Sequence, residues 1–130
     1  MLYEELTRKV IGCAMAVHST LGNGFQEVIY QRALAFEMQA HGISFQREFE
    51  MEILYKGKPI GKRRVDFLVE GNVMVEIKAL TALEDVHLAQ AKNYLEAYHL
   101  PIGLLINFGA RSLQFKRVHL APSQPQSGSS

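Results

Sequence analysis

The chain has 130 residues, of which 48% are hydrophobic, and its formal net charge is +1 at pH 7. This length and composition predict one compact globular domain with a single core. No run of about 18 apolar residues occurs, which argues against a membrane-spanning helix. A net charge near zero argues against a protein that coats nucleic acid nonspecifically, while a local basic patch stays open.

The two ends of the chain and its cysteine indicate where the protein works. The first residues lack the basic and apolar regions of a signal peptide, so we expect a cytoplasmic protein. The single cysteine, Cys13, cannot form an internal disulfide, and we expect a buried thiol in a reducing compartment. Residues 121–130 are rich in Pro, Ser, Gln and Gly, which predicts a disordered tail after one domain over residues 1–120.

Two helices are predicted in the first third of the chain. Apolar residues recur at helical spacing from Tyr3 to Leu21, and a Gly-Asn-Gly segment then ends the helix. A second helix is predicted from Phe25 to Gln39. The residues expected to face the core are Leu6, Val10, Cys13, Met15, Val17 and Leu21 in the first helix, and Ile29, Ala33, Phe36 and Ala40 in the second.

The rest of the chain alternates strands with one helix. The predicted elements are strands over residues 44–55, 60–69, 73–78, 102–108 and 113–120, and a helix over residues 83–98 with Val86, Ala89, Leu95 and Tyr98 inward. The fourth strand is nearly all apolar, which is typical of burial on both faces. We therefore predict an α/β fold, in which an antiparallel meander and a strand after a crossover helix form a mixed sheet flanked by helices.

The hairpin over residues 64–78 carries ionisable residues in strands that otherwise look buried. Strand side chains alternate between faces, so the length of the turn decides which residues lie opposite each other. A three-residue turn over 70–72 places Asp66 opposite Glu76, whereas a two-residue turn would pair Asp66 with Ile77 and mix the faces. We therefore expect one apolar face, made of Val65, Phe67, Val69, Val73, Val75 and Ile77, and one face made of Asp66, Leu68, Met74, Glu76 and Lys78.

Asp66, Glu76 and Lys78 would then bring two carboxylates and an ammonium to one patch. A buried charge is costly unless it is paired or binds a metal. Two carboxylates can hold a divalent cation such as Mg²⁺, which can lower the pKa of a bound water and offset the charge on a phosphate. A lysine on the same face can orient that water or stabilise the transition state. A plain salt-bridged strand face is the alternative interpretation.

Five motifs in chain order resemble the GxxExxY protein family. The segment Gly24-Phe25-Gln26-Glu27-Val28-Ile29-Tyr30 matches the Gly-x-x-Glu-x-x-Tyr signature. The other motifs are Val17-His18 with Leu21-Gly22, Val65-Asp66-Phe67, Glu76-Ile77-Lys78, and Gln90 with Tyr94-Leu95. The likeness covers nearly the whole chain, although Val65 stands where the superfamily name has proline. The family is placed in the PD-(D/E)xK nuclease-like superfamily, so the resemblance implies a restriction-endonuclease-like core.

The resemblance also implies a metal-dependent nuclease acting on nucleic acid, above all a DNA endonuclease. Asp66 and Glu76 would bind Mg²⁺ or Mn²⁺, with the carbonyl of Ile77 as a candidate third ligand. Lys78 would act on the attacking water or the scissile phosphate. Glu27 would be an auxiliary ligand, directly or through water. The remaining site residue is Gln90, which would orient a phosphate or a water.

Simpler interpretations stand beside these roles. The hairpin charges could be a buried ion-pair cluster in an inactive relative that binds nucleic acid or works only with a partner protein. Glu27 could be an acid favoured near a helix N-terminus. Tyr30 and Tyr94 are expected at the rim of the core with locally bonded hydroxyls.

Basic residues gather just ahead of the acids. Lys62, Arg63 and Arg64 follow two further lysines in the same stretch. Such a run is either a solvated turn or a contact to a nucleic-acid backbone. The small size of the chain is also compatible with a homodimer, as in superfamily members that cut two strands.

Overall fold

The computed structural model describes residues 3–120, so the tail predicted at residues 121–130 lies outside the described residues. Its elements are α1 (Glu4–Leu21), α2 (Glu27–Ala40), β1 (Phe45–Tyr55), β2 (Lys58–Val69), β3 (Val73–Lys78), α3 (Asp85–Tyr98), β4 (Ile102–Asn107) and β5 (Gln114–Val118). Every predicted helix and strand is present, and only the ends differ. None of the helices described in residues 3–120 is both long and apolar enough to span a bilayer.

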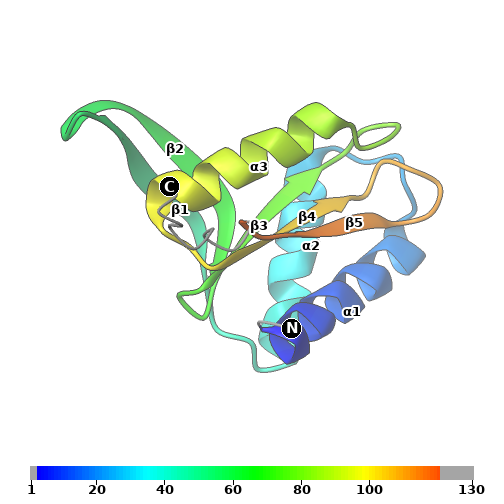
Figure 1. The fold of residues 1–130 in the computed structure, drawn as a ribbon. Coiled ribbons are helices and arrows are strands. Elements are labelled where there is room, and N and C mark those ends of the chain that lie inside the picture. Colours follow the sequence, from blue (N-terminus) through cyan, green and yellow to red (C-terminus); the bar gives the residue numbers. More distant parts are fainter. Residues whose placement is uncertain (1–2, 121–130) are drawn as a thin grey trace, which may run out of the picture.

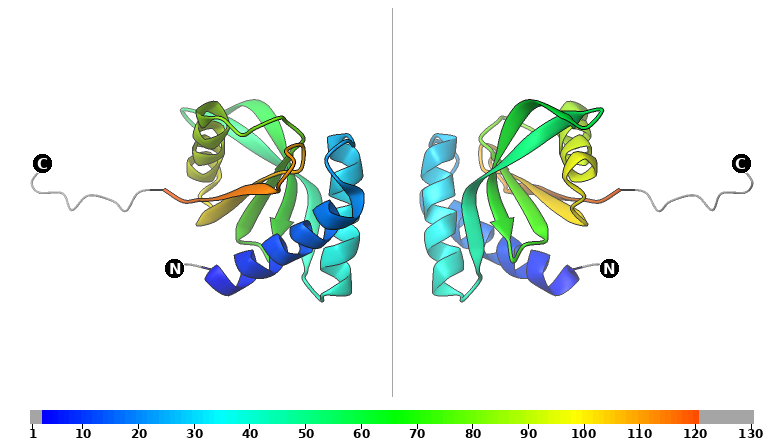
Figure 2. Two further views of the ribbon diagram at one scale, coloured as in Figure 1. Left: turned by 90° about the vertical axis from the view of Figure 1, so that its right-hand side faces the viewer. Right: turned by 90° about the vertical axis from the view of Figure 1, so that its left-hand side faces the viewer.

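The five strands form one mixed sheet in the order β1-β2-β3-β4-β5. Strands β1, β2 and β3 pair in antiparallel fashion, β4 lies parallel to β3 after the crossover through α3, and β5 returns antiparallel to β4. Helices α1 and α2 cover one face of the sheet and α3 covers the other, while the β1–β2 hairpin extends beyond the helices (Figures 1 and 2). This arrangement confirms the predicted α/β fold.

A hydrophobic core lies on each side of the sheet. The larger core joins α1 and α2 to residues such as Phe67, Val75 and Ile77, and the smaller core joins α3 to Met74 and Leu105. Every residue of β4 is buried, as predicted for a strand covered on both faces. The sheet is therefore the middle layer of three.

The turn between β2 and β3 has the predicted length. Val69 pairs with Val73, and the amide of Asn72 donates to the carbonyl of Val69 at 3.1 Å. Gly71 and Glu70 both have positive φ, which lets the chain reverse within three residues. Extending this register along the hairpin places Asp66 opposite Glu76, as the alternation argument requires.

One residue of the predicted apolar face lies on the other side of the sheet. Val65 packs in the core under α3, whereas Phe67 packs in the core under α1 and α2. The partner strand changes face at the same level, because Phe45 packs edge-on against Phe67 while Phe49 packs under α3. Between these two residues Glu48 has a φ of 54°, a left-handed conformation that breaks strand alternation. The β1–β2 ribbon therefore turns over beside Asp66.

The predicted inner faces of the helices are wrong in part. Phe36 is 73% exposed, and Met15 and Val86 are exposed as well. The residues of α2 that are buried are Tyr30, Gln31, Leu34, Ala35 and Met38. Apolar residues occupy two sides of α2, so spacing alone cannot decide which stripe meets the sheet.

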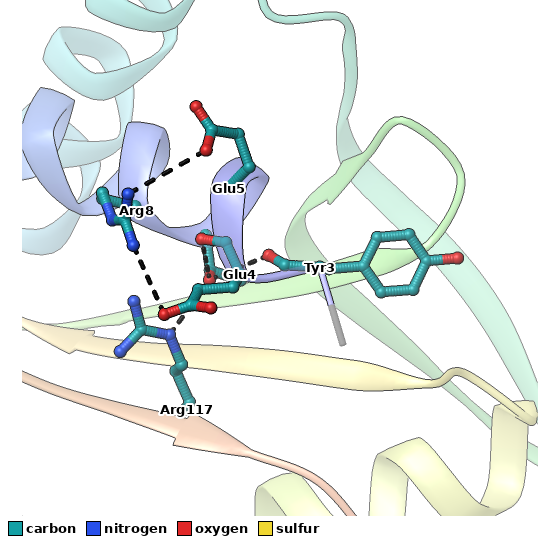
Figure 3. A network of polar contacts seen from close by, with 6 residues as sticks. Tyr3, Glu4, Glu5, Arg8 and Arg117 are labelled. Carbon is teal, nitrogen blue, oxygen red and sulfur yellow. Dashed lines mark hydrogen bonds and ion pairs between the residues drawn. The ribbon is translucent and has the colours of Figure 1, made fainter. Parts of the chain in front are cut away.

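Buried polar contacts fix the first turn of α1 to β5 (Figure 3). The hydroxyl of Thr7 lies 3.0 Å from the carbonyl oxygen of Tyr3, to which it can donate, and it accepts a hydrogen bond from Nε of Arg117 at 3.0 Å. On the outer side of the helix, Arg8 pairs with Glu4 and Glu5. These exposed pairs lie within α1 and contribute little stability. The hydrogen bond between Thr7 and Arg117 is the contact that joins α1 to β5.

Candidate functional site

The β2–β3 ladder gives way to side-chain contacts just beyond the pair Phe67–Val75. Oε1 of Glu76 accepts a hydrogen bond from the amide of Asp66 at 3.2 Å. Oδ2 of Asp66 accepts one from the amide of Ile77 at 2.8 Å. Each carboxylate is thus bonded to the main chain of the opposite strand, and the two predicted acids lie at the same level of the hairpin.

Asp66 is held on the α2 side of the hairpin. Its Oδ1 accepts a hydrogen bond from Nε2 of Gln31 at 2.8 Å, and Gln31 is only 6% exposed. With the Ile77 amide on Oδ2, both carboxylate oxygens have a donor and the rotamer of Asp66 is fixed. The residue keeps partial access to solvent.

Glu76 is held on the α3 side of the hairpin, so the prediction that Asp66 and Glu76 share one strand face is wrong, because the ribbon turns over beside Asp66. Its side chain is 5% exposed, and its carboxylate forms an ion pair with Arg63 at 2.6 Å. The guanidinium of Arg63 lies 4.9 Å from the centre of the Tyr94 ring, a favourable cation–π arrangement. Burial raises the pKa of Glu76; Arg63 opposes this rise and the nearby charge of Asp66 adds to it. A second cation at this position would also lower the pKa and favour the ionised form.

A narrow recess on the α3 side gathers three of the predicted site residues. Glu76 and Lys78 from β3 meet Gln90 from α3 there. His87 and Tyr94 complete the polar part of its lining. The nitrogen Nδ1 of His87 accepts a hydrogen bond from the amide of Glu84 at 3.0 Å, so its ring is fixed at the start of α3.

The end of β3 is fixed by a buried amide on the neighbouring strand. Asn107 pairs with Lys78 in the parallel ladder. Its side chain accepts a hydrogen bond from the amide of Leu80 at 2.8 Å and donates to the carbonyl of Leu80 at 2.9 Å. These hydrogen bonds fix the backbone just after Lys78, and with it the position of the lysine at the end of β3.

Glu27 begins α2 and faces the same region. The pKa of its carboxyl is raised above the usual value, above all because the acid group is partly buried. The charge of Lys78 opposes this rise, and the charge of Asp66 adds to it. The turn ahead of Glu27 is fixed by Tyr30, whose hydroxyl bonds to the carbonyl of Gly22 and the amide of Phe25. The predicted local bonding of Tyr30 is confirmed, although its ring is fully buried.

The donor atoms at this site fit a hard divalent cation. Asp66, Glu76 and Glu27 supply carboxylates, and such oxygens are the ligands that Mg²⁺ and Mn²⁺ prefer. Oε1 of Gln31 is buried without a hydrogen-bond partner among the described residues. Within residues 3–120, however, no three His, Cys, Asp or Glu side chains already form a metal-binding group. Arg63 would have to release Glu76 before its carboxylate could take a cation.

The predicted basic cluster divides between the site and the surface. Arg63 pairs with Glu76 in the site. Lys62 and Arg64 are exposed on β2, where Nζ of Lys62 lies 3.8 Å and Nη2 of Arg64 lies 4.0 Å from the carboxylate of Glu50. Pairs of this kind at the surface are weak. Lys62 and Arg64 are thus available for an external anion at low energetic cost.

Comparison with known proteins assigns the fold. A model of the PD-(D/E)XK nuclease superfamily matches residues 4–118. The chain belongs to this superfamily. Among solved structures, the crystal structure of SSO0001 is similar, with a TM-score of 0.59 and 20% identity, over 93% of this chain and 61% of that chain. At this identity the likeness concerns the fold alone, and a search of curated proteins gave no match.

The acids of the hairpin match the pattern for which the PD-(D/E)XK superfamily is named. Asp66 takes the place of the first acid, and Glu76-Ile77-Lys78 takes the place of acid-x-Lys. Val65 stands in the position of the proline, in the strand segment where the ribbon turns over.

Sequence reasoning missed two features of the site. The first is Gln31, which lies four residues after Glu27 and therefore on the same side of α2. That spacing was the available signal. The second is the position of Arg63 between Glu76 and Tyr94, which no local pattern indicates because Tyr94 comes from a different element.

Proposed function

We propose that the protein is a metal-dependent nuclease of the GxxExxY group that hydrolyses phosphodiester bonds, and that it acts as a DNA endonuclease. The observation that carries this proposal is the pairing of Asp66 and Glu76 across the end of the β2–β3 ladder, with Lys78 on the same strand. In the proposal, Asp66 and Glu76 hold Mg²⁺ or Mn²⁺, helped by Glu27 and the carbonyl of Ile77. The bound cation would lower the pKa of a water and offset the charge that builds up on the phosphate.

The remaining residues act on the substrate in this proposal. Lys78 orients the attacking water or stabilises charge on the scissile phosphate. Gln90, which lines the recess beside Glu76, orients a phosphate or a water. Arg63 leaves Glu76 when the cation binds and joins Lys62 and Arg64 in contacting the nucleic-acid backbone, where a guanidinium can bind phosphate through two parallel hydrogen bonds.

The test is cleavage of single-stranded, duplex and branched DNA in the presence of Mg²⁺ or Mn²⁺. We expect Asp66→Ala and Lys78→Ala each to lower the cleavage rate by at least about 100-fold, because each removes a ligand or a charge needed in the transition state. The matched control is Asp85→Ala, which removes an exposed acid at the start of α3. Unchanged cleavage by Asp66→Ala would contradict the proposal.

A non-catalytic nucleic-acid-binding module, which would act alone or with a partner protein, is the second candidate. The ion pair between Arg63 and Glu76 favours it, because the pair satisfies a buried carboxylate without any metal. Binding to DNA would then weaken with salt but would be indifferent to divalent metal and to Glu76→Ala. Filter-binding assays with and without Mg²⁺ distinguish the two candidates.

A further inference from the structure

Gln31 is buried at the proposed site, and one of its two polar atoms has no hydrogen-bond partner among the described residues. Its side chain comes from the interior face of α2 and is 6% exposed. One end of the amide is used, because Nε2 donates to Oδ1 of Asp66 at 2.8 Å. The other end, Oε1, is buried without a partner among the described residues. An unsatisfied buried acceptor of this kind is uncommon and calls for an explanation.

The orientation of the amide follows from the chemistry of its neighbour. An ionised carboxylate only accepts hydrogen bonds, so turning the amide over would set Oε1 against Oδ1 of Asp66. The N–H end must therefore face Asp66, and the oxygen must face elsewhere. What Oε1 lacks is a donor or a cation, which neither Asp66 nor Glu27 can supply when ionised.

Gln31 lies on the side of α2 that contacts Asp66. Gln31 and Glu27 lie four residues apart on α2 and share one side of the helix. Gln31 contacts Asp66 through its hydrogen bond. The same side of α2 thus carries one carboxylate and one amide side chain.

We propose that Gln31 is a positioning residue of the metal site, whose Oε1 accepts a hydrogen bond from a water carried by the divalent cation while its N–H orients Asp66. This inference rests on the proposed function, because it requires a cation at Asp66. It adds a role for α2 beyond that of Glu27. Outer contacts of this kind are typically worth about 10- to 100-fold in metal affinity.

The experiment is calorimetric titration of the full chain with Mn²⁺ in the absence of nucleic acid. Gln31→Met keeps the length and apolar stem of the side chain but removes both polar ends, and we expect it to weaken Mn²⁺ binding by about 10-fold or more. Gln31→Glu keeps an acceptor oxygen and loses the donor to Asp66. If Oε1 is the functional end, Gln31→Glu, which keeps an acceptor oxygen, binds Mn²⁺ more tightly than Gln31→Met does.

A purely structural role predicts a different result. If Gln31 only holds Asp66 in place, both variants lose the N–H donor and both weaken binding equally, which would overturn the proposal. Unchanged affinity in Gln31→Met would also overturn it, as would a Gln31→Glu chain that stays unfolded in saturating Mn²⁺. The control is Gln39→Met, on an exposed position of the same helix, which should bind as the wild type does.

Asp66→Asn separates this inference from the proposed function. If the wild type binds Mn²⁺ and Asp66→Asn does not, while Gln31→Met is unaffected, the metal site stands and the role of Gln31 fails. If the wild type itself binds no Mn²⁺, or if Asp66→Asn binds it normally, the proposed metal site fails and the role of Gln31 fails with it. Thermal unfolding of each variant without metal shows whether it is folded.

Discussion

At the scale of single residues, Arg63 compensates the charge of the buried acid Glu76. The side chain of Glu76 is 5% exposed, and that of Arg63 is 34% exposed. Burial alone would lower the pKa of Arg63, but the adjacent Glu76 raises it above its usual value. Removing one partner of a buried pair leaves the other charge uncompensated, which costs more than the net worth of the pair.

Arg63→Gln should therefore destabilise the protein in a pH-dependent way. Burial raises the folded-state pKa of Glu76, so protonated Glu76 favours folding, and this stability is lost as the pH rises through the folded-state pKa. Arg63 limits that loss, so its removal costs little near pH 4 and most near pH 7. At pH 7 we expect the free energy of unfolding to fall by about 1–3 kcal/mol, a range reduced for the exposure of Arg63.

Urea denaturation of Arg63→Gln at both pH values measures this difference. The matched control is Arg64→Gln, whose contact with Glu50 at 4.0 Å is exposed and should change stability by less than about 0.5 kcal/mol. An equal loss for Arg63→Gln at the two pH values would show that Glu76 is not the charge that Arg63 compensates.

At the scale of elements, contacts between the C-terminal ends of β3 and β4 position the lysine of the site. The amide of Phe108 donates to the carbonyl of Lys78 at 2.9 Å, and the amide of Gly109 donates to the side chain of Asn107 at 3.1 Å. Gly109 passes so close to the chain after β3 that an added Cβ would lie 2.5 Å from the carbonyl oxygen of Leu80 and would also meet its amide nitrogen. Only glycine allows this approach.

Gly109→Ala should consequently disturb both stability and the placement of Lys78. The clash is with backbone atoms, which cannot rotate away, so we expect the free energy of unfolding to fall by about 1–3 kcal/mol or more. Gly12→Ala is the control, because a Cβ there meets nothing within 4 Å and the helix should gain about 0.5–1 kcal/mol. Urea denaturation compares the two, and a Gly109→Ala protein as stable as the wild type would refute the close approach.

At the scale of the whole molecule, each chain carries one pair of hairpin acids. A single site cuts one strand at a time, so cutting both strands of a duplex requires either two copies or two encounters. We expect a homodimer, with a sedimentation mass near twice the 14.7 kDa of the chain. If sedimentation instead shows a monomer at concentrations where DNA is cleaved, the homodimer is excluded.

Local patterns in the sequence determined the elements and the pairing of the two acids. Helical spacing and turn residues gave the order of helices and strands, and the three-residue turn at 70–72 placed Asp66 opposite Glu76 because strand side chains alternate. These features depend on residues near each other in the chain. The resemblance over the same motifs pointed to the superfamily that the match over residues 4–118 assigns.

The tertiary structure alone decided which helix faces are buried and what surrounds the acids. Phe36 points outward because the opposite side of α2 meets the sheet, and Val65 crosses to the α3 side because Glu48 adopts a left-handed conformation. Gln31 and Arg63 reach the acids from separate elements. Contacts between distant segments depend on the packing of the whole chain, and spacing within one element does not indicate which residues of another element it will meet.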